Sequence, residues 1–249
     1  MAKGTGLGDN FYVGGYDLSG DVGALSSIAS PSATLLATGI NKSAHERIFG
    51  QYDGEISFNS FFNDAALAEH AELKLLPRTD TLVSYFRGTT LGGESACLTG
   101  KQITYDPTRA ADGGLIFSVQ ALSNAYGLEW GKMLTAGKRT DTAATAPATG
   151  VDFTDVSTAF GMAAYLHIFS FTGTSVTMRI QDSADNSSFA NITGLGAFTT
   201  ASASTFERQE TDLLTRTIRR YLKVNTTGTF SECTFAVVAV RYYAADRAL

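Results

Sequence analysis

Segments in which apolar and polar residues alternate recur along the chain and constrain its fold more than any other feature. Val176, Met178 and Ile180 are apolar, and the residues between them are polar. This period of two is typical of a half-buried β-strand, whereas an amphipathic helix has a period of 3.6. Residues 55–59 and 115–122 show the same alternation. The chain is therefore predicted to be mainly β.

The expected strands form two groups. The first comprises residues 55–59, 82–87, 96–105, 115–122 and 128–134, and the second comprises residues 164–171, 176–181, 206–210, 218–224 and 234–243. One helix is expected over about residues 65–76, with Asp64 as its cap, Leu67 and Leu75 on one face and Pro77 as its end. The Asp106-Pro107 and Asp112-Gly113-Gly114 sequences are expected to bound a loop.

Residues 140–150 (TDTAATAPATG) separate the two groups of strands. They contain one Pro and no large apolar residue, so they are expected to form an extended linker. The predicted domains are then residues 1–139, including an N-terminal arm, the linker 140–150, and residues 151–249. We expect an N-terminal antiparallel β-barrel or sandwich with one flanking helix, followed by an Ig-like or jelly-roll β-sandwich.

The charge of the chain argues against a protein that binds phosphate backbones. The formal net charge is −5, and only 17% of residues are charged, against roughly 25% in typical soluble chains. Residues 1–150 contain 11 Lys+Arg against 15 Asp+Glu, and residues 151–249 contain 8 against 9. Nucleic-acid binding needs clustered basic residues. The N-terminus lacks the apolar core of a signal peptide, and no membrane span is expected.

A search for catalytic and metal-binding patterns finds none. His45, His70 and His167 have no neighbours at metal-ligand spacing, and H-E-x-x-H, C-x-x-C and G-x-S-x-G are absent. His70 is expected to be solvated on the helix surface and His167 to lie within a strand. Cys97 and Cys233 are expected to be buried, unpaired thiols. We therefore predict no catalytic residue, metal or cofactor, and no enzyme.

Two polar clusters have simple structural explanations. Residues 182–186 alternate oxygen-bearing side chains but lack the Gly and the distal Glu of a calcium loop, so a polar hairpin turn is expected. Three arginines lie between residues 216 and 220, beside Tyr221. Glu207 and Glu210, on an adjacent predicted strand, are their expected partners.

The order of segments in the first half carries a family resemblance. After an N-terminal arm come DGEISFNSFFND (53–64), a short helix ending at Leu75-Leu76-Pro77, DTLVSYFRG (80–88), GKQITYDP (100–107) and DGGLIFSVQALSN (112–124). Over about residues 10–140 this order resembles the tail tube (major tail) proteins of long-tailed bacteriophages. The segment YDLSGDVGAL (16–25) is similar to those of actinobacterial phages. The second half resembles the β-sandwich that some tail tube proteins display outside the tube, and its residues 165–192 are similar to repeats in many virion surface proteins.

The resemblance implies a non-enzymatic virion protein that assembles with itself. Tail tube proteins form rings, commonly hexameric, in which neighbouring sheets join into an inner barrel, and the rings stack into a tube. DNA passes through an acidic lumen without specific binding. The other implied partners are the tape measure and terminator proteins, with assembly in the host cytoplasm and a final location in the virion tail.

Two segments rich in glycine and polar residues are expected to make the contacts between stacked rings: the arm up to Tyr16 and the loop Asn41–Asp53. The aromatic residues of the arm are expected to anchor it once it docks. The candidate assembly residues are Phe11, Tyr12, Tyr16, Lys42, Glu46, Arg47, Tyr52 and Asp53.

Other roles remain open at this point. A head decoration or tail-terminator protein also uses small β folds, but a terminator stops at one ring. A glycan-binding β-sandwich module would display aromatic platforms. The single tryptophan, Trp130, lies in an alternating segment and is expected to pack in the core.

Overall fold

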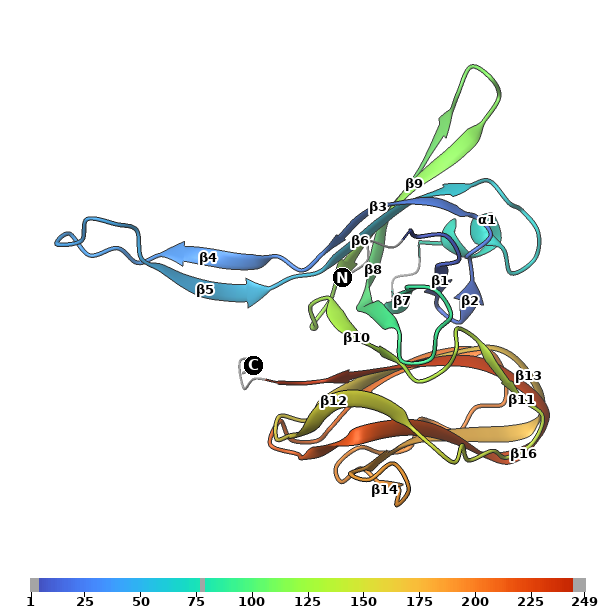
Figure 1. The fold of residues 1–249 in the computed structure, drawn as a ribbon. Helices are drawn as coiled ribbons and strands as arrows, with labels where there is room; N and C mark the ends of the chain where they lie inside the picture. The colour runs from blue at the N-terminus through green and yellow to red at the C-terminus, as the bar shows by residue number, and fades with distance from the viewer. Residues whose placement is uncertain (1–4, 77–78, 244–249) are drawn as a thin grey trace. The chain divides into compact units, whose positions relative to one another are not determined.

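A computed structural model describes residues 5–76 and 79–243. It confirms a mainly β fold with antiparallel sheets and one short helix (Figure 1). The predicted helix end at Pro77 lies outside the described residues. The elements are β1 (Asn10–Val13), β2 (Tyr16–Asp17), β3 (Val22–Ala29), β4 (Ser32–Leu36), β5 (Arg47–Tyr52), β6 (Glu55–Phe61), α1 (Glu69–Leu73), β7 (Thr81–Phe86), β8 (Glu94–Arg109), β9 (Leu115–Ser123), β10 (Glu129–Met133), β11 (Arg139–Asp141), β12 (Val151–Thr158), β13 (Met162–Ser183), β14 (Ala190–Asn191), β15 (Thr205–Glu210) and β16 (Ile218–Arg241).

The chain forms two compact units that interleave along the sequence. The sandwich unit comprises residues 1–19, 84–97 and 130–249, and the hairpin unit comprises residues 20–83 and 98–129. Strands β7 and β8 each begin in one unit and end in the other. The sequence-based ranges 1–139, 140–150 and 151–249 stay a prediction about which parts fold independently.

Two long strands, β13 and β16, organise the sandwich unit. The first half of β13 pairs with β15 on one side and with the second half of β16 on the other. The second half of β13 pairs with β14 and with the first half of β16, which in turn pairs with β12. Two layers result (Figure 1). Their facing side chains form one apolar core that includes Leu166, Ile168, Met178, Ile180 and Phe235.

The sequence analysis divided each of these long strands into two, and that division is wrong. The strands bend at irregular pairing around Gly173, where φ is +157°, and Gly228, where φ is +126°. A strand glycine often marks a bulge, which bends the strand without ending it. Here the two glycines let β13 and β16 pass from one layer to the other.

The predicted linker, residues 140–150, is held against the sandwich unit. Its first two residues belong to β11, which pairs with β16. The Thr145 and Thr226 main chains exchange two hydrogen bonds, of 3.1 and 2.9 Å. The Asn186 side chain accepts a hydrogen bond from the Gly150 N–H at 2.7 Å. The segment lacks large apolar residues, as the sequence shows, yet its backbone donors and acceptors fix it along β16.

The hairpin unit contains a four-stranded antiparallel sheet in the order β3–β6–β9–β8. Ile56 and Phe58 of β6 and Val119 of β9 are buried, and the residues between them are half-exposed or exposed. The predicted alternation is confirmed here. β8 also continues through Pro107 to Arg109, so Asp106-Pro107 does not begin a loop; the turn lies in residues 110–114.

The helix is shorter than predicted. α1 covers Glu69–Leu73 only, because Leu67 adopts a φ of +64°, which an α-helix does not tolerate. Leu67 and Leu75, expected on the buried face, are exposed, and Leu73 and Ala68 are buried instead. The apolar spacing in this region therefore did not identify the packed face.

Trp130 was also placed wrongly. It is 51% exposed, while its strand neighbours Gly131 and Met133 are buried. Buried and exposed residues do alternate in β10, but Trp130 occupies one of the exposed positions, so its indole lies away from the core. Cys97 and Cys233 are buried and unpaired, as predicted.

Candidate assembly surface

The β4–β5 hairpin is the feature of the hairpin unit that most needs a partner. The two strands form a sheet of their own, with Leu35 opposite Ile48, Thr34 opposite Phe49 and Leu36 opposite Arg47. Figure 1 shows this ribbon extending away from the β3–β6–β9 sheet. An isolated two-stranded hairpin is marginally stable in water. This one therefore gains stability if another surface covers it.

Apolar side chains line both faces of the hairpin. Directly opposed residues share a face, so Leu35 and Ile48 occupy one face and Phe49 the other. Phe49 is 76% exposed, and Leu35, Leu36, Ile48 and Tyr52 are each more than half exposed. A cluster of exposed apolar residues of this kind marks an interaction site.

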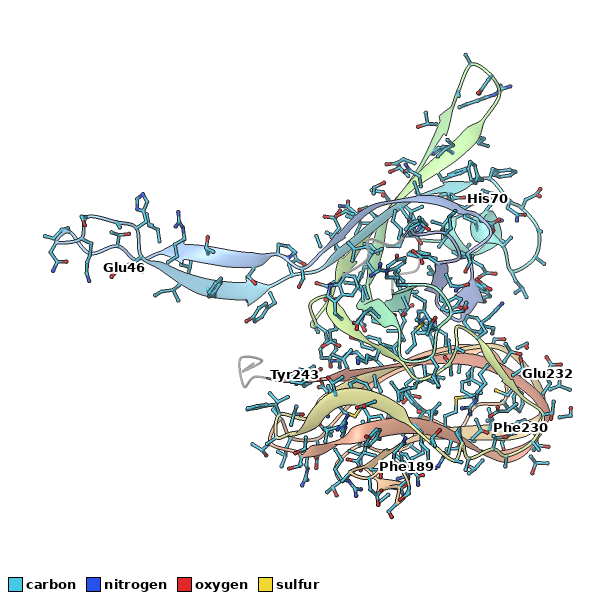
Figure 2. All side chains as sticks on the ribbon, in the orientation of Figure 1. Glu46, His70, Phe189, Phe230, Glu232 and Tyr243 are labelled. Atoms are coloured by element: carbon cyan, nitrogen blue, oxygen red, sulfur yellow. The ribbon has the colours of Figure 1, made fainter. Side chains whose placement is uncertain are left out.

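The structure brings together five of the candidate assembly residues in and around this hairpin. Lys42 and Glu46 form an exposed ion pair at 3.0 Å near its far end (Figure 2). Arg47 and Tyr52 are the first and last residues of β5, and Asp53 follows them. The expectation that residues 41–53 form a loop without strand structure is wrong, because β5 occupies residues 47–52.

The arm contributes differently from what the sequence suggested. Phe11 and Tyr12 are buried, and the Tyr12 ring contacts Phe86 and Phe169 at centroid distances of 4.8 and 4.7 Å. These rings anchor the arm within its own chain and offer no surface to a second subunit. Tyr16 is half-exposed in β2.

The turn between β1 and β2 is formed by Gly14 and Gly15, with φ of +57° and +86°. Two successive positive φ angles are typical of the tight two-residue turn of a hairpin. The N-terminal glycines thus belong partly to an ordered hairpin, which sequence reasoning missed.

The two central rows of the non-core face of the β3–β6–β9–β8 sheet are polar, and the row beyond them joins the exposed Phe61 to the exposed Ile116. The pairing places Asn59 opposite Ser118 and Ser118 opposite Asp106. The next row joins Ser57 to Gln120 and Gln120 to Thr104. Paired residues lie on the same face. The two central rows therefore present hydroxyls, amides and a carboxylate.

The negative charge of the chain belongs to the hairpin unit. Counted over the same residue ranges as the two units, the hairpin unit contains 6 Lys+Arg against 11 Asp+Glu, or −5, and the sandwich unit contains 13 against 13. Within the hairpin unit Lys101 is neutralised by Asp80 at 2.5 Å. This unit is expected to repel a DNA backbone.

A polar cluster fixes α1 against the sheet of the hairpin unit. Glu69 is buried and accepts hydrogen bonds from Ser60 Oγ at 2.7 Å and Tyr105 Oη at 3.2 Å. Burial raises the pKa of Glu69. His70 Nδ1 lies 2.8 Å from Tyr105 Oη, and its ring is half-buried beside Phe117. The prediction of a solvated His70 is therefore wrong.

In the sandwich unit His167 lies beside Ser84, but the pair is not arranged as a nucleophile and its base. The Gly15 N–H donates to His167 Nδ1 at 3.3 Å, so the ring proton sits on Nε2, 2.9 Å from Ser84 Oγ. Ser84 Oγ therefore accepts a hydrogen bond from His167 Nε2–H and donates one to Cys97 Sγ at 3.4 Å. All three side chains are buried, and burial raises the pKa of the Cys97 thiol to about 11.

The three arginines of residues 216–220 pair with aspartates, at N–O distances of 2.6–2.7 Å. Arg216 bonds Asp212, Arg219 bonds the buried Asp182, and Arg220 bonds Asp152. The prediction of Glu207 and Glu210 as partners is wrong, because the fold places the aspartates closer.

A polar turn joins β13 to β14, as predicted, but it begins later than residue 182, because Asp182 and Ser183 still belong to β13. Asp185 accepts hydrogen bonds from the main-chain N–H groups of Ser187 and Ser188, which lower the pKa of its carboxyl. Over residues 5–76 and 79–243, no group of three or more His, Cys, Asp or Glu side chains is placed to hold a metal ion. No helix in those same ranges is long and apolar enough to cross a membrane.

Comparison with known proteins gives distant structural similarities only. No family model matches the chain, and no curated protein matches it. Among solved structures, the tail of an empty GTA particle with C6 symmetry is 16% identical, covers 51% of this chain and 97% of its own, and gives a TM-score of 0.38. The Dit protein of phage SPP1, described as part of a hub adsorption apparatus, is 14% identical with a TM-score of 0.32, covering 94% and 99%. The phage p2 baseplate structure is 10% identical with a TM-score of 0.33, covering 95% and 99%.

Proposed function

We propose that this chain is a structural subunit of a phage tail that associates with copies of itself into rings, commonly of six, which stack into the tail tube. The observation that carries the proposal is the β4–β5 hairpin, a two-stranded ribbon with apolar residues on both faces. A second copy of the same chain is the occupant that a ring supplies at every position, because ring formation repeats one heterologous interface.

The sheet of the hairpin unit supports the same arrangement. Within the described residues, β3 pairs only with β6, so its other edge has no strand partner. Unpaired strand edges are a hazard in a monomer and a means of assembly in an oligomer. Joining such edges from copy to copy continues the sheet around a ring.

A tube built this way would present a surface suited to passing DNA. The hairpin unit carries the net charge of −5, and the two central rows of the non-core face of its sheet are polar without a basic cluster. Duplex DNA is repelled by such a wall and does not adhere to it. On this proposal the location is the virion tail, and tape measure and terminator proteins are further partners.

The test uses sedimentation velocity on the full chain and on an Ile48→Ser/Phe49→Ser double variant. Burying each side chain contributes roughly 1.5–3 kcal/mol per interface, so the variant should associate about a hundredfold more weakly or worse. Both residues are exposed in the single chain, so circular dichroism and thermal midpoint should not change. Leu213→Ser, at a residue 52% exposed in the sandwich unit, is the matched control and should associate like the parent chain.

Equal association of the double variant and the parent chain would exclude the hairpin as the ring contact. Single rings that do not stack would favour a terminator over a tube protein. A chain that stays monomeric at all concentrations would leave a head decoration protein or a glycan-binding module as the better explanation.

A further inference from the structure

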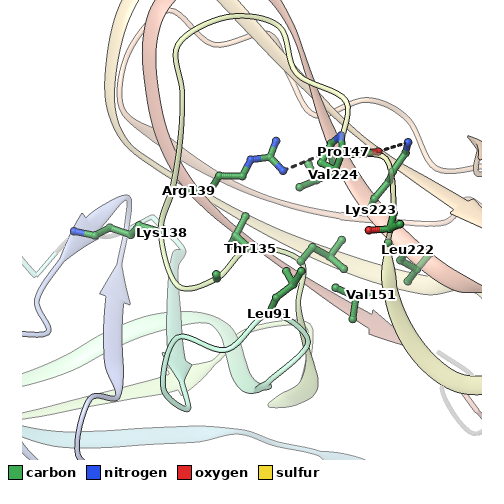
Figure 3. A pocket seen from close by; sticks show the side chains of 13 residues that line it. Leu91, Thr135, Lys138, Arg139, Pro147, Val151, Leu222, Lys223 and Val224 are labelled. Atoms are coloured by element: carbon green, nitrogen blue, oxygen red, sulfur yellow. Dashed lines mark hydrogen bonds between the residues drawn. The ribbon is translucent and has the colours of Figure 1, made fainter. Parts of the chain in front are cut away.

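The sandwich unit contains a cavity that the assembly proposal does not use. Its volume is ≈ 230 Å³, and it lies where residues 134–139, residues 147–151 and β16 come together (Figure 3). Leu134, Val151 and the β16 residues Leu222 and Val224 are buried aliphatic residues of its wall, and the exposed Leu91 also lines it. The wall offers close contact to an aliphatic group.

The charged residues of the lining are all cations: Lys138, Arg139 and Lys223. Two of them already have carboxylate partners. Lys138 pairs with Asp17, and Arg139 Nη2 pairs with Asp141 Oδ2 at 2.8 Å. Arg139 also has a buried Nε–H without an acceptor, so its guanidinium retains a free donor beside the cavity.

Lys223 is the cation without a carboxylate. Its Nζ donates to the Pro147 carbonyl oxygen at 2.7 Å and lies 4.1 Å from the centre of the Phe189 ring (Figure 3 shows the first of these contacts). Among the side chains that the structure describes, no Asp or Glu forms an ion pair with it. Partial removal from water lowers the pKa of Lys223. An anion next to the Lys223 ammonium group would offset this desolvation and stabilise the charged form.

We infer that this cavity binds a small organic anion, a carboxylate or phosphate monoester whose charged group meets Lys223 and whose aliphatic body packs on Leu134, Val151 and Leu222. An apolar cavity of about 150 Å³ holds benzene, and pockets for drug-sized ligands begin at about 300 Å³. A ligand of roughly six to ten non-hydrogen atoms follows from those two limits. No aromatic ring is among the lining residues, which favours an aliphatic body over a sugar ring.

The experiment measures binding to the full chain by isothermal titration calorimetry with four probes. Hexanoate and hexyl phosphate combine charge with an aliphatic body, hexanol has the body alone, and acetate has the charge alone. We expect hexanoate or hexyl phosphate to bind about tenfold more tightly than hexanol or acetate, as one charge-assisted contact allows. Whichever of hexanoate and hexyl phosphate binds more tightly shows whether the natural ligand carries a carboxylate or a phosphate.

Four variants locate the site. Lys223→Gln should reduce anion binding about tenfold and leave hexanol binding unchanged, and Leu91→Trp should weaken every probe by filling the cavity. Arg179→Gln removes a cation that does not line the cavity and should bind like the parent chain. Unchanged thermal midpoints show that the variants are folded, and Lys223→Arg restores binding if charge is the cause. Equal binding of hexanoate and hexanol, equal behaviour of Lys223→Gln and Arg179→Gln, or no binding of any probe would overturn the proposal.

Discussion

Acidification should destabilise the chain through His167. The ring is buried in the sandwich unit, where desolvation lowers its pKa from 6.5 to about 3. Because the folded pKa lies below the unfolded one, the unfolded state binds the proton first as the pH falls. His167 therefore costs nothing above pH 6.5, and stability declines as the pH falls from there towards 3. A difference of about 3.5 units corresponds to a loss of about 5 kcal/mol at most, or about 1.4 kcal/mol per pH unit.

The assay is urea unfolding of the parent chain and of His167→Gln at several pH values between 7.5 and 4.5, a range chosen to include about two units of the titration. Glutamine does not titrate but retains a donor and an acceptor for Ser84 and the Gly15 N–H. Titratable groups that both chains share contribute equally to the pH dependence of the unfolding free energy. The difference between the two slopes of this free energy against pH therefore isolates the contribution of His167. Identical pH dependence of the two chains would refute the assignment of a buried, neutral imidazole.

Three further outcomes follow from packing and pairing. Phe58→Ala should lower the free energy of unfolding by about 3–5 kcal/mol, because Phe58 is 1% exposed. Trp130→Ala should change that free energy by about 1 kcal/mol or less. Denaturant titration compares the two variants, and a larger loss for Trp130→Ala would contradict the placement of Trp130 on the exposed side of β10. Asp182→Ala leaves the Arg219 guanidinium and main-chain N–H without their acceptor and should cost about 1–3 kcal/mol by the same titration; an unchanged midpoint would show that the pair is not formed. Asp9→Ala removes the carboxylate that accepts the Gly88 N–H at 2.9 Å and should lower the thermal midpoint relative to Leu7→Ala, at a residue 88% exposed; equal midpoints would contradict that anchor.

The strand content could be read from the sequence because burial on one face imposes a visible period of two. The prediction for residues 206–210 matches β15, and that for residues 115–122 matches β9 to one residue. The residues at which strands begin and end could be predicted less well from the sequence. Residues 172–175 and 225–233 were left out of the predicted strands because they do not alternate clearly, yet both belong to long strands that bend near Gly173 and Gly228.

Pairing across long sequence separations explains the other errors. Trp130 was assigned to the core because alternation gives a period but no phase, and the phase is set by which residues meet β16. The helix was overextended because the backbone at Leu67 turns to a positive φ despite a helical apolar spacing. His70 was judged solvated because Tyr105, its partner, is 35 residues away in sequence.

The candidate assembly surface could be found only in part. The polar residues Lys42, Glu46 and Arg47 drew attention to the correct segment, but Leu35 and Ile48 did not, since apolar residues in a strand are normally read as core. Their exposure is evident only from the fold. The same fold shows that β16 pairs with β10 and β11. A truncation of residues 151–249, which the sequence alone would suggest for testing the tube domain, therefore strips partners from the remaining strands.

Negative-stain electron microscopy of the purified full chain tests the central claim most directly. Self-association through the β4–β5 hairpin predicts closed rings that stack into long tubes of uniform width, and the Ile48→Ser/Phe49→Ser variant should show neither. A field of small, monodisperse particles from the parent chain, over the whole accessible range of concentration, would contradict the proposed role.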